Sequence, residues 1–349
     1  MHRILWFAVV FSLFAQQAPF GVQSRLVLVP VTVTDEKGNP VDGLAPEAFT
    51  VFDNGQLRPV TVDTIATGVA PLALVVAVQA SGISLPVLDK VTRVGSMIQP
   101  LLTGERGCAA VLAFSEELKW VQECTSNPDL IARAFHNIQA GEYRQARLLD
   151  AASAAIDKLR NHPNSRRALL LISETRDRGS ETEIAPVLVA AQSAGVAVYA
   201  ASYSAFLSSF TERTIRKAPV GKRRKTPIEE TGGHTAAPPA CGPYGCPDFP
   251  LPPPEQRVDL LAAIGELVRL GEVNTADALS KGTGGAVFSF NKLKGLEEAI
   301  EKLSAEVHSQ YLLSFAPTGA APGHHKIEVR VSVPKARVRA RPAYWVQNP

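Results

Sequence analysis

The sequence predicts an α/β fold in which an open, mostly parallel, doubly wound sheet is joined to a smaller all-β part. Continuous apolar runs, such as residues 72–78 and 168–172, are typical of strands buried on both faces. Segments with helical spacing of apolar residues alternate with these runs, as in doubly wound sheets. Shorter β-rich stretches precede and follow the alternating region.

Length and composition are those of a globular protein. The chain has 349 residues, 46% hydrophobic and 20% charged, so it can bury a sizeable core. A formal net charge of +3 over this length does not favour nucleic acid as a partner. Four cysteines are too few for a disulfide scaffold. Prolines cluster near residues 238–254, which predicts one irregular segment.

Residues 1–24 have the layout of a secretory signal peptide. A short basic start precedes an apolar stretch over residues 4–15, and polar residues follow. Cleavage could follow Ala18 or Ser24. The stretch is shorter than the roughly 20 apolar residues of a membrane span, so we expect no transmembrane helix in the mature chain. The protein is therefore expected to be exported, and to be periplasmic, cell-surface or secreted, where disulfides form.

Residues 25–68 predict the N-terminal strands of a small β-sandwich. The expected strands are rich in β-branched and aliphatic residues and cover 26–29, 31–34, 49–52 and 58–65. Pro30 is expected to separate the first two. Asp53-Asn54-Gly55 predicts a tight hairpin turn.

Residues 69–306 predict the α/β domain. Its expected strands are apolar and cover residues 72–78, 108–114, 118–123, 168–172, 196–201 and 286–290. Its expected helices repeat apolar residues at three- and four-residue spacing and cover 88–102, 129–138, 148–159, 184–194, 258–270, 275–280 and 293–307. Gly195 is the expected stop signal of the fourth helix.

Residues 307–349 predict the C-terminal strands of the sandwich, at 311–315, 326–333 and 336–339. The simplest arrangement joins both ends of the chain into one sandwich, with the α/β domain inserted between its strands. Within that domain, residues 204–256 form a basic and proline-rich insert, expected as a long loop. Its basic run is expected to be a solvated or protease-sensitive segment, and a nucleic-acid or anionic-surface patch is the alternative.

Six short motifs stand near the two ends of this pattern. They are residues 31–38 (VTVTDEKG), 41–44 (VDGL), 49–55 (FTVFDNG), 282–288 (GTGGAVF), 309–315 (SQYLLSF) and 338–344 (VRARPAY). Together they resemble the von Willebrand factor type A (VWFA) domains, and most closely the bacterial, acidobacterial-type VWFA-related family. The likeness covers about residues 25–205 and 257–346. It implies a Rossmann-like type A fold.

The resemblance also implies a metal-ion-dependent adhesion site, in which three loops at the carboxyl edge of the sheet hold one Mg²⁺ through oxygen ligands. The first loop departs from the family pattern. Gln79 stands in place of its aspartate, and Ser81 is retained. Ile83 replaces the second serine, although Ser84 follows one residue later.

The second and third loops depart from the pattern as well. Ala146 replaces the threonine of the second loop, and Glu174 takes the place of the aspartate in the third. These donors are a poor replacement for the water around Mg²⁺, which dehydrates reluctantly. We therefore expect a degenerate site, no bound metal and no cofactor, with a Mg²⁺-dependent adhesin as the alternative.

The cysteines sort into two local pairs. If the hairpin pairs Phe114 with Leu118 and keeps that register, Cys108 faces Cys124 within reach of a disulfide, with two free thiols as the alternative. Cys241–Cys246 encloses four residues and predicts a small disulfide ring, with a zinc half-site as its rival.

We expect a non-enzymatic protein-binding or adhesion-type function. Neither a nucleophile elbow nor a phosphate loop is present. The ligand-binding surface is expected around Gln79, Ser81, Ser84 and Glu174, because doubly wound sheets bind ligands at the carboxyl edge. The expected partner is a protein at the cell envelope or outside, not a nucleic acid or a small-molecule substrate. A structural role in an envelope assembly is a further alternative.

Overall fold

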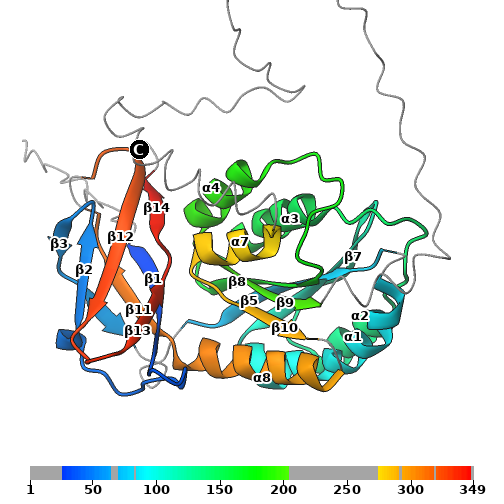
Figure 1. Cartoon of the computed structure of the whole chain (residues 1–349), viewed down its shortest axis with the longest axis horizontal. Coiled ribbons are helices and arrows are strands. Elements are labelled where there is room, and N and C mark those ends of the chain that lie inside the picture. Colours follow the sequence, from blue (N-terminus) through cyan, green and yellow to red (C-terminus); the bar gives the residue numbers. More distant parts are fainter. Residues whose placement is uncertain are drawn as a thin grey trace, which may run out of the picture.

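The fold comes from a computed structural model, which describes residues 26–63, 70–81, 84–203, 274–290, 293–317 and 320–346 (Figure 1). Several expectations fall outside these ranges: the signal peptide over 1–24, Ile83, the insert over 204–256, its Cys241–Cys246 pair, and the helix over 258–270. In the described part of the chain, no helix is both long and apolar enough to cross a membrane.

A six-stranded sheet forms the centre of the larger part of the molecule (Figure 1). Its spatial order is β10 (Val287–Phe290), β9 (Val196–Tyr203), β8 (Arg166–Ser173), β5 (Leu72–Gln79), β6 (Cys108–Phe114) and β7 (Leu118–Thr125). All neighbours are parallel except β7, which runs antiparallel at one edge. The central strand β5 is buried along its whole length, as its apolar run predicts.

Helices cover both faces of this sheet, which confirms the expected doubly wound arrangement (Figure 1). One face packs against α1 (Leu85–Ile98), α2 (Pro128–His136) and α8 (Leu293–Ser309). The other packs against α3 (Leu148–Arg160), α4 (Ile184–Ala194) and α7 (Thr275–Thr283). A short π-helical turn, η4 (Gln99–Thr103), extends α1. Gly195 ends α4 in the left-handed conformation, with φ of 61°, as expected of a helix stop.

Two four-stranded sheets lie beside the larger part (Figure 1). One has the order β13 (Arg337–Ala340), β1 (Val27–Thr34), β11 (Tyr311–Phe315) and β4 (Thr61–Asp63). The other has the order β14 (Ala343–Val346), β12 (Gly323–Val331), β2 (Phe49–Asp53) and β3 (Gln56–Arg58), and a 3-10 turn, η1 (Pro46–Ala48), precedes β2. Each sheet therefore combines strands from both ends of the chain.

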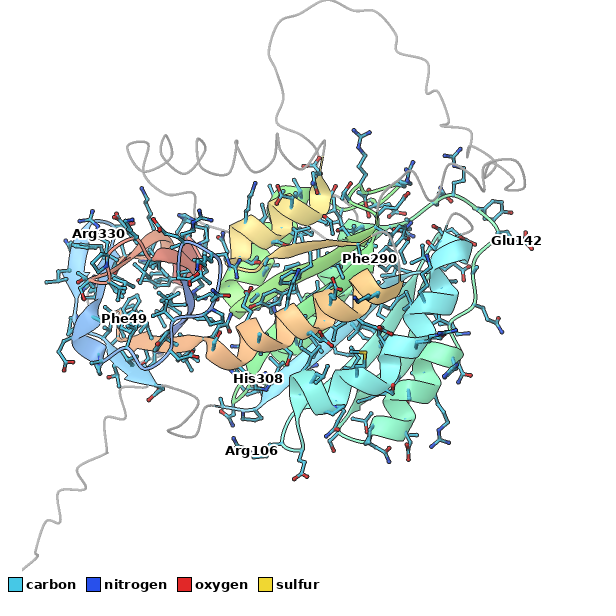
Figure 2. The ribbon with its side chains drawn as sticks, turned by 60° about the horizontal axis from the view of Figure 1, so that its bottom comes forward. Phe49, Arg106, Glu142, Phe290, His308 and Arg330 are labelled. Atoms are coloured by element: carbon cyan, nitrogen blue, oxygen red, sulfur yellow. A yellow bond between two sulfur atoms is a disulfide. The ribbon has the colours of Figure 1, made fainter. Side chains whose placement is uncertain are left out.

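The two small sheets contribute to one apolar cluster. Phe49 is buried in this cluster, whereas Arg330 lies at the surface (Figure 2). Strand β2 alternates buried and half-buried residues, which is the pattern of a strand with one face on a core. The Asn54-Gly55 turn joins β2 to β3 with positive φ at both residues, as a tight hairpin requires.

Two expectations about the N-terminal strands are wrong. Pro30 does not divide β1, because β13 pairs only with Val31–Thr34 and leaves the backbone at Pro30 with a partner strand on one side. The return strand expected over residues 58–65 is two strands, since β3 pairs with β2 whereas β4 pairs with β11 in the other sheet. Pro59, which has no N–H, lies at the crossing between the sheets.

The Cys108–Cys124 disulfide is present, with the Cα atoms 5.3 Å apart. The register that motivated it holds only near the turn, where Phe114 pairs with Leu118. Two irregularities then shift the ladder, so that Ala109 pairs with Thr125. The cysteines are therefore close without being direct partners in the ladder.

Candidate functional site

The candidate site lies where β5 and β8 end side by side. We call these two carboxyl ends, with the loops that follow them and the loop before α3, the loop edge. The chain leaves β5 toward β6 on one side and later returns to β8 on the other, so the strand order reverses here. Crevices at such reversals are the usual ligand sites of doubly wound sheets. Gln79 is the last residue of β5, and Glu174 follows the last residue of β8.

Four residues of the loop edge and Tyr203 of β9 form one chain of hydrogen bonds, which we call the polar network. The Gln79 side-chain amide donates to Ser81 Oγ over 2.9 Å, and its carbonyl accepts the backbone N–H of Glu174, also over 2.9 Å. Ser81 Oγ lies 3.1 Å from Ser84 Oγ, which lies 2.9 Å from the hydroxyl of Tyr203 at the end of β9. The network thus joins β5, β8 and β9.

The polar network is buried. Gln79, Ser81, Ser84 and Glu174 are each no more than 2% exposed. Burial raises the pKa of Tyr203 well above its ordinary value, and the negative charge of Glu174 adds to this effect against the hydrogen bond with Ser84. The phenol therefore stays protonated. Since buried polar groups require partners, the network accounts for the burial of these side chains.

Glu174 forms an ion pair with Arg178. The Nε atom of Arg178 donates to Oε2 of Glu174 over 2.9 Å, and the Arg178 side chain is 33% exposed whereas that of Glu174 is 3% exposed. The backbones of Ala146 and Arg178 exchange two hydrogen bonds of 2.9 and 3.0 Å. These bonds tie the loop before α3 to the loop after β8. The guanidinium therefore extends from a buried carboxylate to the surface.

The carboxylate of Asp150 connects the loop before α3 to the loop before α4. Asp150 accepts from Nε of Arg147 over 2.7 Å and from the backbone N–H groups of Glu181 and Thr182 over 3.1 and 3.0 Å. Burial alone would raise the pKa of Asp150, but a hydrogen bond from the Thr182 side chain, followed by those from the two backbone N–H groups and Arg147, holds it below its ordinary value. Asp150 is therefore ionised at neutral pH and anchors both loops.

The side chains of the polar network are poorly suited to act as ligands of Mg²⁺. Both polar atoms of the Gln79 amide are already in hydrogen bonds inside the protein. Ala146 offers no side-chain oxygen, and Arg178 supplies the cation beside Glu174. Mg²⁺ requires near-octahedral oxygen ligation and gives up its water reluctantly, so it would have to break this network to bind.

The structure brings Gln79, Ser81, Ser84 and Glu174 together, as their places in the sequence suggested. All four are buried beneath the surface of the loop edge, whereas the side chain of the neighbouring Arg178 is partly exposed. The sequence pattern did not predict two further residues of the site: Tyr203, which completes the polar network, and Arg178, which pairs with Glu174. A tyrosine at the end of an apolar strand is a weak signal for Tyr203. Four-residue spacing from Glu174 is a weak signal for Arg178, because the residues between form an irregular loop.

Comparisons with known proteins give structural neighbours only. No family model matches the chain, and no curated protein matches it. The solved structure of BatB from Bacteroides thetaiotaomicron is 14% identical, with a TM-score of 0.41, over 67% of this chain and 97% of that one. An aerotolerance-related membrane protein from Bacteroides fragilis is 15% identical, with a TM-score of 0.39, over 66% of this chain and 99% of that one.

A third neighbour is the vWF domain of the type V pili tip protein Mfa5 from Porphyromonas gingivalis. It is 12% identical, with a TM-score of 0.28, over 31% of this chain and 39% of that one. The structural neighbours thus include a vWF domain, and all three likenesses are at low identity and low TM-score.

Proposed function

We propose that the protein is an exported, non-enzymatic, adhesion-type domain that binds another protein at its loop edge without a metal ion. The observation that carries this proposal is the replacement of metal ligands by the polar network. The network holds β5, β8 and β9 in place, and Arg178 presents a positive charge where a type A domain would hold its cation.

Arg178 indicates the chemistry of the partner. A guanidinium has five N–H donors, and Nε uses its own on Glu174. A fork of this kind binds carboxylates in two-point contact. Since a third of the side chain is exposed, we propose that the partner presents an aspartate or glutamate to Arg178. The carboxylate would then contact the guanidinium directly.

A binding function suits the hydroxyl groups of the loop edge better than catalysis does. A nucleophilic serine needs an adjacent base. Within the described residues, the hydroxyls of Ser81 and Ser84 bond to an amide, to each other and to the Tyr203 phenol. None of these partners is a base at neutral pH. This supports a non-enzymatic function.

Export and domain organisation are proposed on separate grounds. The layout of residues 1–24 and the Cys108–Cys124 disulfide both suit an oxidising compartment. Because the two small sheets take strands from both ends and share one apolar cluster, we propose that they form a single sandwich into which the α/β domain is inserted.

The partner site is tested by removing both members of the ion pair together. Glu174→Gln with Arg178→Gln leaves no lone buried charge, so the fold should survive. The variant and the unchanged chain are each immobilised and exposed to envelope fractions. We expect the variant to capture at least about 10-fold less of the proteins that the unchanged chain binds. A tenfold loss of affinity corresponds to about 1.4 kcal/mol of binding free energy. Capture by the unchanged chain should also weaken as salt is raised.

Arg160→Gln is the matched control, because Arg160 ends α3 at the opposite end of the sheet. It should leave capture unchanged. Equal capture by the double variant and the unchanged chain would contradict the location of the binding site.

Metal independence has its own test. We expect no calorimetric heat from Mg²⁺ or Mn²⁺ at submillimolar concentration, and the same capture with and without a chelator. Capture lost in chelator, together with metal binding abolished by Glu174→Ala, would instead support the Mg²⁺-dependent adhesin.

A further inference from the structure

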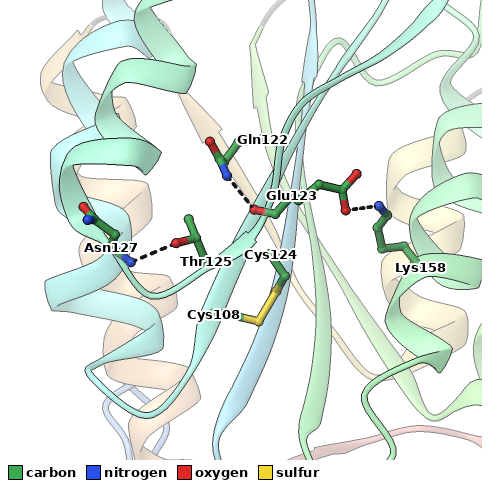
Figure 3. Close-up of a disulfide and its surroundings, with 7 residues drawn as sticks. All are labelled: Cys108, Gln122, Glu123, Cys124, Thr125, Asn127 and Lys158. Atoms are coloured by element: carbon green, nitrogen blue, oxygen red, sulfur yellow. Dashed lines mark hydrogen bonds and ion pairs between the residues drawn. A yellow bond between two sulfur atoms is a disulfide. The ribbon is translucent and has the colours of Figure 1, made fainter.

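Three metal-ligating side chains converge far from the loop edge. The Sγ atoms of Cys108 and Cys124 and a ring nitrogen of His162 all lie within 4.8 Å of one another, and we call these residues the thiol–imidazole cluster. Cys108 begins β6, Cys124 lies in β7, and His162 follows α3. The cluster thus lies at the opposite end of the sheet from the loop edge, in the region of the disulfide in Figure 3.

We propose that this cluster is a redox-gated site for a thiophilic metal ion, with Zn²⁺ as the ion it fits. Two thiolates and one imidazole are typical zinc ligands, and a site with three protein ligands keeps a fourth position for water. The disulfide closes the site, because its sulfurs are bonded to each other. Reduction opens it.

The distances suit tetrahedral zinc. Zinc lies about 2.3 Å from a thiolate and about 2.0 Å from an imidazole nitrogen, so its sulfur ligands are about 3.7 Å apart. Side chains whose Cα atoms are 5.3 Å apart can place two sulfurs at that separation without moving the strands. The His162 nitrogen lies within 4.8 Å of both sulfurs, and tetrahedral zinc would bring it to about 3.5 Å, which shortens these distances by at most about 1.3 Å.

The surrounding framework does not depend on the disulfide alone. Strand β6 pairs with β5 along its length and with β7 on its other side. Lys158 of α3 forms an ion pair with Glu123 (Figure 3) and lies over the ring of Trp120, 4.4 Å from its centroid. These contacts hold α3 against β7, so the ligands should remain close after reduction. Ligand sites on such rigid elements are well positioned.

The loop that carries His162 is also held in place. The backbone N–H of His162 donates to the carbonyl of Leu159 over 3.1 Å, and the carbonyl of His162 accepts from the N–H of Ser165 over 3.2 Å. All three residues of the cluster are half-buried, so a reductant and an ion can reach them.

The chemical steps balance with a dithiol as reductant. The dithiol passes two electrons and two protons to the sulfurs of Cys108 and Cys124 and becomes a disulfide itself. Zn²⁺ then binds the two sulfurs, and both thiol protons pass to solvent. In the reverse direction the ion leaves, and a disulfide oxidant takes two electrons from the cysteine thiolates and two protons from solvent to become a dithiol.

Zinc titration of the full chain tests the proposal. Since Cys241 and Cys246 could themselves bind the probe, every sample carries both as serine. We expect the chain reduced by a phosphine to bind one equivalent of Zn²⁺ in competition with a chromophoric chelator, and the oxidised chain to bind none. Co²⁺ should give thiolate-to-metal charge-transfer absorption in the reduced chain only.

His162→Gln isolates the imidazole, because this loop position can change without disturbing either cysteine. It should weaken zinc binding by at least about 10-fold, whereas His136→Gln, an exposed position at the end of α2, should have no effect. A reduced chain that binds no more Zn²⁺ than the oxidised chain would overturn the proposal. So would equal affinity in the His162→Gln variant.

Discussion

Glutamine at position 79 changes the chemistry of the loop edge. An aspartate there would carry a negative charge and would have no N–H to offer. The Gln79 amide is neutral, donates to Ser81 and accepts from the backbone of Glu174, so it satisfies its neighbours without a cation. Gln79 is therefore a structural residue of the loop edge, and Arg178 pairs with the Glu174 carboxylate beside it.

A second buried polar cluster joins the four strands of one small sheet. Asp53 is 1% exposed and accepts from Arg58, His325 and Tyr344 at distances of 2.9 to 3.1 Å. The other ring nitrogen of His325 lies 2.7 Å from the carbonyl of Ala321. A buried charge with several partners is satisfied, so Asp53 links β2, β3, β12 and β14.

The neighbouring His324 predicts a pH dependence of stability. Burial, and then the charge of His325, lower the pKa of His324 to about 4. Between about pH 6.5 and 4 the unfolded chain binds a proton that the folded chain does not, so stability falls as the pH drops through this window. His324 accounts for at most about 3 kcal/mol of this loss in the free energy of unfolding.

Denaturant unfolding of the unchanged chain and of His324→Gln at pH 4.5 and 7 measures this share. The variant should lose less stability on acidification than the unchanged chain does. His136→Gln, at an exposed position, should keep the original pH dependence. The same loss in His324→Gln as in the unchanged chain would contradict the assignment.

At the scale of elements, Gly284 joins the two parts of the molecule. It ends α7 with φ of 82°, and a Cβ atom there would lie 2.5 Å from the backbone nitrogen of Arg341, between β13 and β14. We expect Gly284→Ala to lower the free energy of unfolding by at least about 2 kcal/mol, because backbone strain and the clash with Arg341 add.

Gly38→Ala is the control for this prediction. Gly38 has φ of 86°, but a Cβ atom there would meet no other atom within 4 Å, so only backbone strain should appear, at about 1 kcal/mol. Thermal unfolding compares the two variants. Equal shifts in Tm would mean that the close approach to Arg341 has no energetic consequence.

On the scale of the whole molecule, polar contacts connect the α/β part to the small sheets. Gln310, just before β11, donates to the Tyr199 hydroxyl of β9 over 2.7 Å, and Arg341 donates to the carbonyl of Gln192 at the end of α4 over 3.4 Å. Burial raises the pKa of Tyr199 and lowers that of Arg341 to about 10. Tyr199 therefore stays protonated at neutral pH, and so does Arg341, because its lowered pKa is still well above 7.

These contacts predict that the two parts unfold together. Tyr199→Phe should leave the Gln310 amide poorly paired and cost about 1–2 kcal/mol, while denaturant unfolding stays a single transition. Tyr143→Phe, in the loop before α3, should change stability little. Two separate transitions in the unchanged chain would contradict this coupling.

Features that depend on residues close together in the chain can be predicted from the sequence. The apolar run of β5, the end of α4 at Gly195 and the Asn54-Gly55 turn follow from side-chain pattern and backbone preference within a few residues. The sequence also predicts that Gln79, Ser81 and Glu174 lie at one edge of the sheet, because the ends of parallel strands meet there.

Features that join residues distant in the chain depend on how the strands and helices pack. The path of β1 through Pro30 depends on which strands flank it, and the shift of the β6–β7 ladder is not visible in the spacing of Cys108 and Cys124. Tyr203 joins the polar network from a strand more than a hundred residues away from Ser84 in the sequence. Such contacts form because packing brings separate strands together. The backbone and side-chain preferences of a few neighbouring residues do not determine which distant strands meet.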